Sequence, residues 1–503
     1  MTRIILLLVF SLSLSIINAQ DITQNIKGSV IDNSSKETIP FATITIIGTD
    51  PIIGTTSDME GNFILNNVPI GRYDLQISYL GYEPIIMPEV MVTSAKEVVL
   101  SIALTESAFA LNEVVLKPKL VKAKPLNEMA SVSTRMLSVE EANRYAGGFD
   151  DPARLASSFP GVASSVGNNA IVIRGNAPKY LQWKIEGVEV SNPNHFADLG
   201  SFGGGGLTAL SSDFFTGAFP AEYNNALSGV FDIRMRKGNS SVLEHSFEIG
   251  AIGIDFASEG PISKKNNASY LVNYRYSTLG LVSSLLPDDA DGTNYQDLSF
   301  KLTLPTKKYG IFSVWGIGLI DKSGSKPETE TDKQIYYQDI EKQDVRQYMG
   351  AVGINHRLVF ENSAYLNSTL SISANGIDLK TDRLDDTSQL QPENEINNKN
   401  YNITFKSFIN KKFNSTHTNK TGIMVRGLGY DLNLKENQGE PENGLNSLVD
   451  EDGFSSLVSA FSSSSISLKK WQLNIGLNSQ LFTLNNSFAL EPRLGLNYQL
   501  NDN

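Results

Sequence analysis

Apolar and polar side chains alternate with a period of two residues in the part of the chain that follows Asn239. Between positions 270 and 276, tyrosines and a valine at even positions alternate with Asn273 and Arg275. Because successive side chains of a strand point to opposite faces, this pattern predicts strands with one apolar and one polar face. The same alternation occurs at positions 298–304, 471–478 and 493–498.

The connections between these predicted strands alternate in length. Short turns are expected near 264–267, 305–308 and 361–363, and long polar loops near 287–296, 321–343 and 382–399. A soluble β-sandwich would show the same local alternation of side chains. Short turns on one side and long loops on the other are typical of strands that cross an outer membrane, so the connections favour a membrane-spanning antiparallel sheet.

The N-terminus shows a different pattern. Arg3 precedes an apolar run at positions 4–17, and the small residue Ala19 follows. This order predicts a signal peptide, residues 1–19, and a buried N-terminal strand or helix is the alternative. No later stretch is apolar over the length of a transmembrane helix. Any membrane span must therefore be built from strands.

Residues 21–105 predict a first domain made of short strands. Tyr73, Leu75 and Ile77 alternate with polar residues, which indicates a strand with one buried face. Short strands of this kind between Gly, Pro and Asn turns predict a small β-sandwich of about 80 residues, a common domain size. The predicted strands lie at positions 26–31, 41–47, 61–65, 72–79 and 98–104.

Composition adds to this picture. The chain has 503 residues, which is too many for one ordinary core. Its formal net charge of −12 argues against a nucleic-acid partner, whose phosphates need a basic surface. The absence of cysteine excludes disulfides, thiol catalysis and cysteine-bound zinc. The mean hydropathy of −0.16 is compatible with a membrane sheet, because lipid-facing and lumen-facing residues average out.

Residues 126–239 predict a domain of helices and strands. A capping box at Ser138 and Glu141 predicts one short helix, and Asp151 followed by Pro152 predicts the start of a second. The glycines at positions 203–206 are not followed by Lys-Ser or Lys-Thr, so they predict a flexible loop rather than a phosphate cradle.

Two glycines in this domain are expected at positions that need backbone freedom. Gly175 ends a predicted strand, and Gly187 follows Glu186 between two alternating segments, as in a hairpin. A Cβ at either glycine would obstruct a positive φ.

The order of motifs in this region resembles the plug domain of a TonB-dependent outer-membrane receptor, of the SusC-like type of Bacteroidota. Residues 21–105, with motifs such as 57–63 and 79–82, resemble the carboxypeptidase regulatory-like domain, which commonly precedes such plugs and implies no peptidase activity. Asn224 stands where the pattern has glycine; because asparagine tolerates a left-handed turn, the fold should survive. Segment 207–212 is shorter than usual. The plug motif residues are Arg174, Gly175, Glu186, Gly187, Asn192, Pro193, Asn194, His195, Phe196, Pro220, Glu222, Tyr223 and Gly229.

The resemblance implies a mainly β chain with an N-terminal β-sandwich, an α+β plug and an incomplete antiparallel transmembrane β-barrel at residues 240–503. The linker, residues 106–125, holds an apolar hexapeptide in the place of a TonB box. Such a segment can add as an edge strand to a partner sheet, and a last strand of the sandwich is the alternative. The hexapeptide consists of Leu111, Asn112, Glu113, Val114, Val115 and Leu116.

The resemblance also implies location and partners. The chain would lie in the outer membrane with its N-terminal domain in the periplasm, in contact with lipid. Its partners would be a TonB-type energy-transducing protein, an extracellular nutrient ligand (glycan, peptide or siderophore), and a surface lipoprotein or the missing half of the barrel. The implied function is import, and a surface receptor or adhesin without transport is the alternative.

Enzyme chemistry finds little support. His245, Glu248 and His356 superficially match a zinc carboxypeptidase, but residues three apart on a strand point to opposite faces. Asp289 and Asp291 resemble half of a calcium loop, although no glutamate closes it, so a solvated loop is favoured. We therefore predict no catalytic residues, no resident metal and no cofactor.

One expectation concerns the size of the barrel. Receptors of this kind enclose the plug in about 22 strands, whereas the residues after Asn239 offer only about 11 strand-like segments. We therefore expect a truncated or split receptor whose strands form a curved, open sheet beside the plug, and which does not transport alone. A first strand near Val242 paired with segment 494–500 would contradict this expectation.

Overall fold

The computed structural model describes residues 22–107, 119–120, 127, 129–130, 133–137, 155–164, 171–191, 193–195, 212–250, 253–278, 294–438, 444–468, 470–498 and 500. The contacts divide the chain into two units, one within residues 1–122 and one that comprises 123–503 with two short earlier segments. Several predicted features lie outside the described residues: the signal peptide 1–19, the hexapeptide 111–116, the helix near 138–145, Asn192, Phe196, the glycines 203–206, Asp289 and Asp291.

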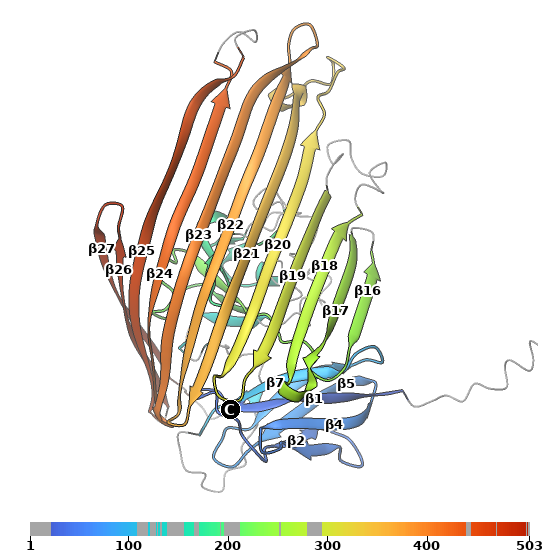
Figure 1. The fold of residues 1–503 in the computed structure, drawn as a ribbon, viewed down its shortest axis with the longest axis vertical. Coiled ribbons are helices and arrows are strands. Elements are labelled where there is room, and N and C mark those ends of the chain that lie inside the picture. The colour runs from blue at the N-terminus through green and yellow to red at the C-terminus, as the bar shows by residue number, and fades with distance from the viewer. Residues whose placement is uncertain are drawn as a thin grey trace, which may run out of the picture. The chain divides into compact units, whose positions relative to one another are not determined.

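The described part of the first unit consists of two sheets around one core. The strand orders are β4-β1-β7 and β3-β2-β5-β6-β8 (Figure 1). Leu75 and Ile77 of β5 are fully buried, as the alternation predicts, and they pack with Ile26 and Ile44. The prediction missed β3, β6 and β8. The strands are β1 (Thr23–Asp32), β2 (Thr43–Ile46), β3 (Gly54–Thr56), β4 (Asn62–Pro69), β5 (Gly71–Ser78), β6 (Ile85–Val92), β7 (Val98–Leu104) and β8 (Lys119–Leu120).

The second unit contains a five-stranded sheet, here called the small sheet, with the order β13-β12-β15-β14-β9. The central strands β12 and β15 run parallel, and every described residue of both strands is buried. Leu155 and Ala156 are helical and follow the predicted helix start at Asp151. The elements are β9 (Thr134–Leu137), β12 (Leu181–Ile185), β13 (Val188–Val190), β14 (Ser212–Phe215) and β15 (Gly229–Ile233), with the pair β10 (Val162–Ala163) and β11 (Val172–Ile173) and the 3-10 helix η3 (Pro178–Tyr180).

Two hairpin turns of this unit have positive φ at both central residues. Glu186 and Gly187, with φ of 53° and 84°, join β12 to β13. Arg174 and Gly175, with φ of 51° and 82°, follow β11. This is the type I′ geometry, whose twist matches that of paired strands. The expected need for backbone freedom at both glycines is therefore confirmed.

The left-handed residue near Tyr223 differs from the expectation. Among the described residues of this turn, Asn225 has a positive φ of 57°, and Asn224 does not. Asn224 is instead buried, and its carbonyl oxygen accepts a hydrogen bond of 3.1 Å from Gln182 Nε2. Asn224 is thus held by a polar contact, and its neighbour Asn225 makes the turn.

The rest of the second unit is one antiparallel sheet, here called the large sheet, which runs from β16 to β27 in sequence order. Its described part has 12 strands, against about 11 predicted, and β16 does not pair with β27 (Figure 1). An open sheet is the predicted arrangement. The strands are β16 (Glu244–Ile249), β17 (Gly253–Ser263), β18 (Ala268–Ser277), β19 (Asn294–Pro305), β20 (Ile311–Ser325), β21 (Glu341–Phe360), β22 (Ala364–Leu384), β23 (Leu390–Asn414), β24 (His417–Glu436), β25 (Asn446–Leu468), β26 (Trp471–Phe482) and β27 (Ser487–Tyr498).

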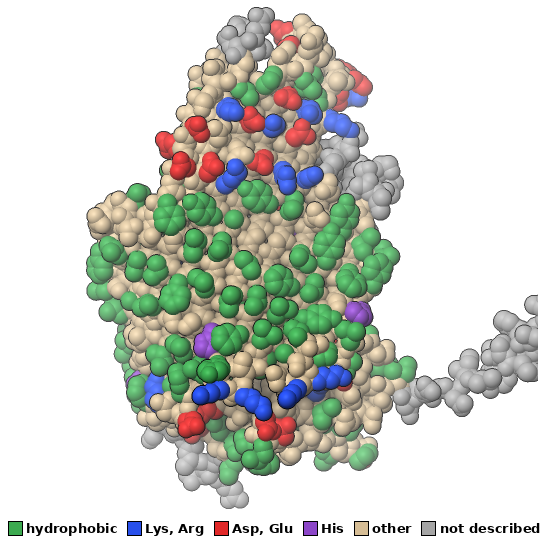
Figure 2. All heavy atoms as spheres, in the orientation of Figure 1, with side chains coloured by type: hydrophobic (Ala, Val, Ile, Leu, Met, Phe, Trp, Pro, Cys, Tyr) green, Lys and Arg blue, Asp and Glu red, His purple; other side chains and the backbone are tan. Residues whose placement is uncertain are grey.

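The large sheet has an apolar outer face and a polar inner face. On β22, Leu370 and Ile372 are exposed, whereas Thr369, Ser371 and Ser373 are buried. Figure 2 shows the outer side chains as an apolar band, with charged side chains beyond it toward one end of the longest strands. This arrangement suits strands that face lipid on one side. In the described part of the chain, no helix is long and apolar enough to cross a membrane.

Two of the predicted long loops are shorter than expected, because strand residues occupy part of each. β22 extends to Leu384 and β23 begins at Leu390, so only a short turn remains of the loop expected at 382–399. Likewise β20 and β21 extend into 321–343 and leave residues 326–340, which include the 3-10 helix η9 (Tyr337–Ile340). The sequence there is polar on both faces, and cross-strand pairs such as Lys380 with Glu395 at 3.0 Å replace apolar contacts.

Two glycines of the second unit, Gly175 and Gly229, predict different results on substitution by alanine. At Gly175 no atom lies within 4 Å of an added Cβ, so Gly175→Ala is opposed only by its φ of 82° and should cost about 1 kcal/mol. At Gly229 the added Cβ would overlap Ile173 Cδ1 and lie 2.9 Å from the carbonyl oxygen of Phe215. Gly229→Ala should therefore accelerate hydrogen exchange of β15 more strongly than Gly175→Ala accelerates exchange in its own turn. Equal protection in both variants would contradict this assignment.

Candidate functional site

The small sheet packs against the inner face of the large sheet through an apolar cluster. Trp315 of β20 is fully buried among residues of the small sheet, and Ile317, Leu319 and Met349 belong to the same cluster. These apolar side chains stand among mainly polar residues of the inner face. They place β12 and β13 beside β20 and β21, and polar contacts surround this apolar cluster.

Glu222, a predicted motif residue, makes the most highly charged of these contacts. Its carboxylate lies 2.7 Å from Lys420 Nζ and 3.5 Å from Lys406 Nζ, on two strands of the large sheet. Asn127 Nδ2 also donates to it at 2.7 Å. Burial raises the pKa of Glu222, but the two ammonium groups outweigh burial and hold this pKa well below its usual range. The carboxylate therefore stays ionised and joins the two sheets at ordinary pH.

Glu186 makes a second contact from the hairpin turn between β12 and β13. Lys301 Nζ of β19 lies 2.9 Å from Glu186 Oε1, and Asn355 Nδ2 of β21 donates to Oε2 at 2.8 Å. Trp315 Nε1 in turn donates to Asn355 Oδ1 at 3.2 Å. The glutamate that precedes the turn glycine is thus a docking residue as well as a turn residue.

A third contact joins β13 to β24. Arg426 Nη1 lies 2.7 Å from Glu189 Oε2, and the Arg426 side chain is only 3% exposed. Gln182 Nε2 donates to the same carboxylate oxygen at 2.6 Å. Glu189 therefore links two strands of the small sheet to one strand of the large sheet.

His195 makes the fourth contact and is completely buried. Its Nε2 lies 2.8 Å from Asp297 Oδ2 and its Nδ1 contacts Asp321, so β19 and β20 both hold the ring. Arg275 Nε also donates to Asp297 Oδ2, at 2.9 Å. Burial lowers the pKa of His195, but the hydrogen bonds to Asp297 and Asp321 outweigh burial and leave this pKa raised. The imidazolium is thereby favoured between two carboxylates.

Lys184, in the middle of β12, is the least satisfied charged residue of the small sheet. Among the described residues no atom hydrogen-bonds to its buried Nζ, which lies 4.7 Å from the ring centre of Tyr223. Burial, with a smaller contribution from the positive charge of Lys406, lowers the pKa of Lys184 to about 7. Three carboxylates oppose this shift without cancelling it: Asp232, Glu189 and Glu222.

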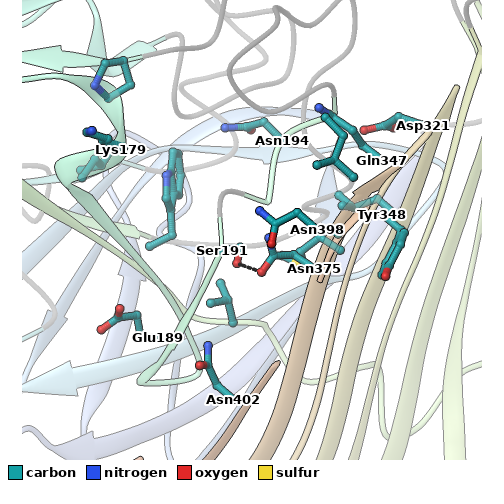
Figure 3. Close-up of a pocket in the computed structure, with 18 of the residues that line it drawn as sticks. Lys179, Glu189, Ser191, Asn194, Asp321, Gln347, Tyr348, Asn375, Asn398 and Asn402 are labelled. Atoms are coloured by element: carbon teal, nitrogen blue, oxygen red, sulfur yellow. Dashed lines mark hydrogen bonds between the residues drawn. The ribbon is translucent and has the colours of Figure 1, made fainter. Parts of the chain in front are cut away.

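A cavity of about 410 Å³ lies between the small sheet and strands β20 to β23. Figure 3 shows polar side chains entering it from both sides, with Asn375 and Asn398 of the large sheet opposite Ser191 of the small sheet. Ser191 Oγ donates to Asn375 Oδ1 at 2.6 Å across the junction. The volume of the cavity lies within the range of small-molecule sites.

The predicted motif residues are brought together only in part. Glu186, His195 and Glu222 lie at the junction of the two sheets and contact the large sheet. Arg174, Gly175, Gly187 and Gly229 have backbone roles in turns and close packing. Pro193, Asn194 and Tyr223 are buried beside the junction, and Pro220 accepts a turn hydrogen bond from the backbone of Tyr223.

Sequence reasoning missed the partners on the large sheet. The partners stand at inward positions, and each has an apolar outward neighbour on at least one side: Lys301, Asp297, Lys406 and Arg426. A charge inside an alternating segment must face the lumen, because the lipid-facing side excludes it. That signal marks such residues as inward but does not reveal their partners. Lys184, between Trp183 and Ile185, gave no signal at all.

Among the described residues, no group of three or more His, Cys, Asp or Glu side chains is arranged so that it could hold a metal ion. His245 lies on β16 and stacks on Phe256, whereas His356 lies on β21 and stacks on Phe312. The two strands are separated by four others in the large sheet.

Comparison with known proteins agrees with this geometry. Residues 26–116 match the family model of the CarboxypepD_reg-like domain. Curated proteins gave no match. Among solved structures, the chain is similar to the pyoverdine outer membrane receptor FpvA of Pseudomonas aeruginosa, with 12% identity, a TM-score of 0.56, and 74% of this chain and 61% of that chain covered.

Two further structures give similar values. The siderophore receptor PirA of Acinetobacter baumannii has 15% identity and a TM-score of 0.52, over 74% of this chain and 59% of that chain. The outer membrane transporter YddB of Escherichia coli has 13% identity and a TM-score of 0.50, over the same shares. This chain therefore spans about three fifths of the length of these structures.

The fold is thus similar to that of outer-membrane receptors. The chain combines this fold with a CarboxypepD_reg-like domain at residues 26–116.

Removal of the Glu222 charge should loosen the junction of the two sheets. Glu222→Gln leaves Lys406 and Lys420 buried without their counter-ion. The loss of one partner of a buried ion pair costs roughly 3–5 kcal/mol of stability. Hydrogen exchange of β15 should accelerate accordingly. Glu395→Gln is the control: its carboxylate pairs with Lys380, whose side chain is 67% exposed, so the change should have little effect. Equal effects of the two variants would refute the docking role of Glu222.

The lowered pKa of Lys184 predicts how the stability of the small sheet changes with pH. Between pH about 7 and 10.5 the unfolded chain binds a proton at Lys184 that the folded chain does not, so the stability of the small sheet should rise with pH. Lys184→Met should remove this rise and stabilise the sheet near pH 7. Protection of β12 amides, measured across this pH range, tests both effects, with the exposed Lys179→Met as control. An unchanged slope in Lys184→Met would show that other groups cause the dependence.

Proposed function

We propose that this chain is a TonB-dependent receptor of the outer membrane that imports a nutrient, with the small sheet as part of the gate. The observation that supports this function best is the set of charged contacts that join the two sheets around their apolar cluster. Glu186, Glu189, His195 and Glu222 each meet an oppositely charged partner on the large sheet.

A polar junction suits a part that moves inside a water-filled lumen. An apolar junction would expose hydrophobic surface on opening, at about 25 cal/mol for each Å². Charged side chains that separate regain hydration, which offsets much of the lost attraction. The contacts therefore hold the closed state in one register and permit an ordered rearrangement when force is applied.

The proposed arrangement assigns a role to each part of the chain. Residues 1–19 direct export, residues 21–105 form a periplasmic domain, residues 106–125 a linker, residues 126–239 the plug and residues 240–503 the wall. Within the linker, residues 111–116 would add as a strand to a TonB-type protein, which supplies the force. The match to the CarboxypepD_reg-like model reaches residue 116, so these residues have a second candidate role as the last strand of that domain.

A surface receptor without transport is the second candidate. Strands β22 to β25 have 20 to 25 residues each, far more than the 9–11 or so that a membrane-spanning strand needs. A long extramembrane extension suits a binding surface. Transport and binding differ in their dependence on the linker, which gives the test.

Val114→Pro should abolish energy-dependent uptake and leave ligand binding unchanged. Proline removes a backbone donor and prevents strand addition at the centre of the hexapeptide. Lys122→Pro, in the same linker but outside the hexapeptide, is the matched control. Uptake that persists in cells whose only receptor is Val114→Pro would favour the surface receptor.

The absence of cysteine from the chain allows a direct test of contact. Val114→Cys should form a disulfide in cells with a TonB-type protein that has a cysteine on its edge strand, and Lys122→Cys should not. Protease resistance of the N-terminal domain in each variant shows whether the hexapeptide is needed for its folding. Loss of resistance in Val114→Pro would assign the hexapeptide to that domain.

A further inference from the structure

The polar side chains that line the cavity between the two sheets are mainly uncharged hydrogen-bonding groups. Side-chain amides predominate, and each offers both a donor and an acceptor. They come from β12 and the segment after β13 on one side and from β21, β22 and β23 on the other, as Figure 3 shows for most of them. The amides are Gln182, Asn194, Gln347, Asn375, Asn398 and Asn402.

The charged residues that line the cavity are engaged in contacts with the protein. Glu189 pairs with Arg426 and accepts from Gln182. Asp321 contacts the ring of His195. Lys179 is exposed, and its Nζ lies 5.4 Å from the ring centre of Tyr180. The cavity therefore has no cluster of charge that would compensate a multiply charged ligand.

Two acceptor atoms in the cavity lining could accept a hydrogen bond from a ligand. Gln182 Oε1 and Gln347 Oε1 are buried and have no hydrogen-bond partner among the described residues. The orientation of the Gln182 amide is fixed, because its nitrogen faces two acceptors, Glu189 Oε2 at 2.6 Å and the carbonyl oxygen of Asn224 at 3.1 Å. An unpaired buried acceptor is unfavourable, so a ligand that donates to it gains affinity.

We propose that this cavity binds an uncharged, hydroxyl-rich ligand, an oligosaccharide, through Gln182, Gln347 and Asn398. A hydroxyl group both donates and accepts, which matches the amides on both sides. The ring of Trp183, stacked on Phe231 with 5.0 Å between centres, adds apolar surface for the C–H face of a sugar. This inference rests on the proposed function, because it takes the cavity as the site of the imported nutrient.

Other ligand classes fit these groups less well. A free peptide has a charged terminus at each end, and neither end would find an unengaged counter-charge beside the amides. An anionic ferric siderophore presents mainly acceptor oxygens, which leave Gln182 Oε1 and Gln347 Oε1 unpaired. The binding test includes a probe of each of these two classes.

The test measures binding to the full chain in detergent by titration calorimetry. The probes are maltohexaose, cellohexaose, xylohexaose and mannohexaose, a capped neutral Gly-Ser hexapeptide, and ferric enterobactin. We expect at least one oligosaccharide to bind. Gln347→Leu and Asn398→Leu should each weaken that binding at least fivefold.

Asn397→Leu is the matched control. Asn397 precedes Asn398 on β23, and its side chain donates to Asp378 rather than lining the cavity. Its binding should equal that of the wild type. The inference is overturned if none of the four oligosaccharides binds, if only the peptide or ferric enterobactin binds, or if the cavity variants bind as tightly as Asn397→Leu. Oligosaccharide binding without energy-dependent uptake would uphold this inference and reject import.

Discussion

The second unit is organised by a single constraint, which is that the large sheet has lipid-compatible side chains on one face and hydrated side chains on the other. Strands with this alternation cannot offer a broad apolar surface to whatever lies inside them. The small sheet therefore docks through one apolar cluster around Trp315 and through charged contacts elsewhere. Because the inner face carries hydrated side chains, the contacts to it are charged, they need buried counter-ions, and the cavity beside them has a polar lining.

This constraint also explains why charge is distributed so unevenly in the small sheet. Glu222 has two lysine partners, whereas Lys184, one strand away, has none among the described residues. A buried ion pair adds little to stability compared with apolar packing, but the loss of one partner is costly. The charged contacts thus favour one register between the two sheets and add little to the stability of the junction. Such a junction has few alternative arrangements, because each shift would leave a buried charge unpaired.

Much of the fold could be predicted from the sequence where one physical rule acted alone. The alternation near 270–276 identified β18, and the pair of Glu186 and Gly187 identified a turn, because each depends only on neighbours along the chain. The extension of β22 and β23 could not be predicted, since their polar residues are typical of loops and only cross-strand pairing shows otherwise. The partners of Glu222 were equally hidden, because Lys406 and Lys420 lie about 200 positions further along the chain, a separation at which no local pattern acts.

The length of β25 has a consequence for solubility. In the described residues its pairing with β26 starts at Leu457, so the stretch 446–455 has a ladder partner only on β24. An edge of this length presents unpaired amide and carbonyl groups, to which a strand of another molecule could add. The centre of that edge is acidic: Asp450, Glu451 and Asp452 follow one another. Two such edges brought together would place like charges opposite each other, so this part of the sheet is protected against aggregation by electrostatic repulsion.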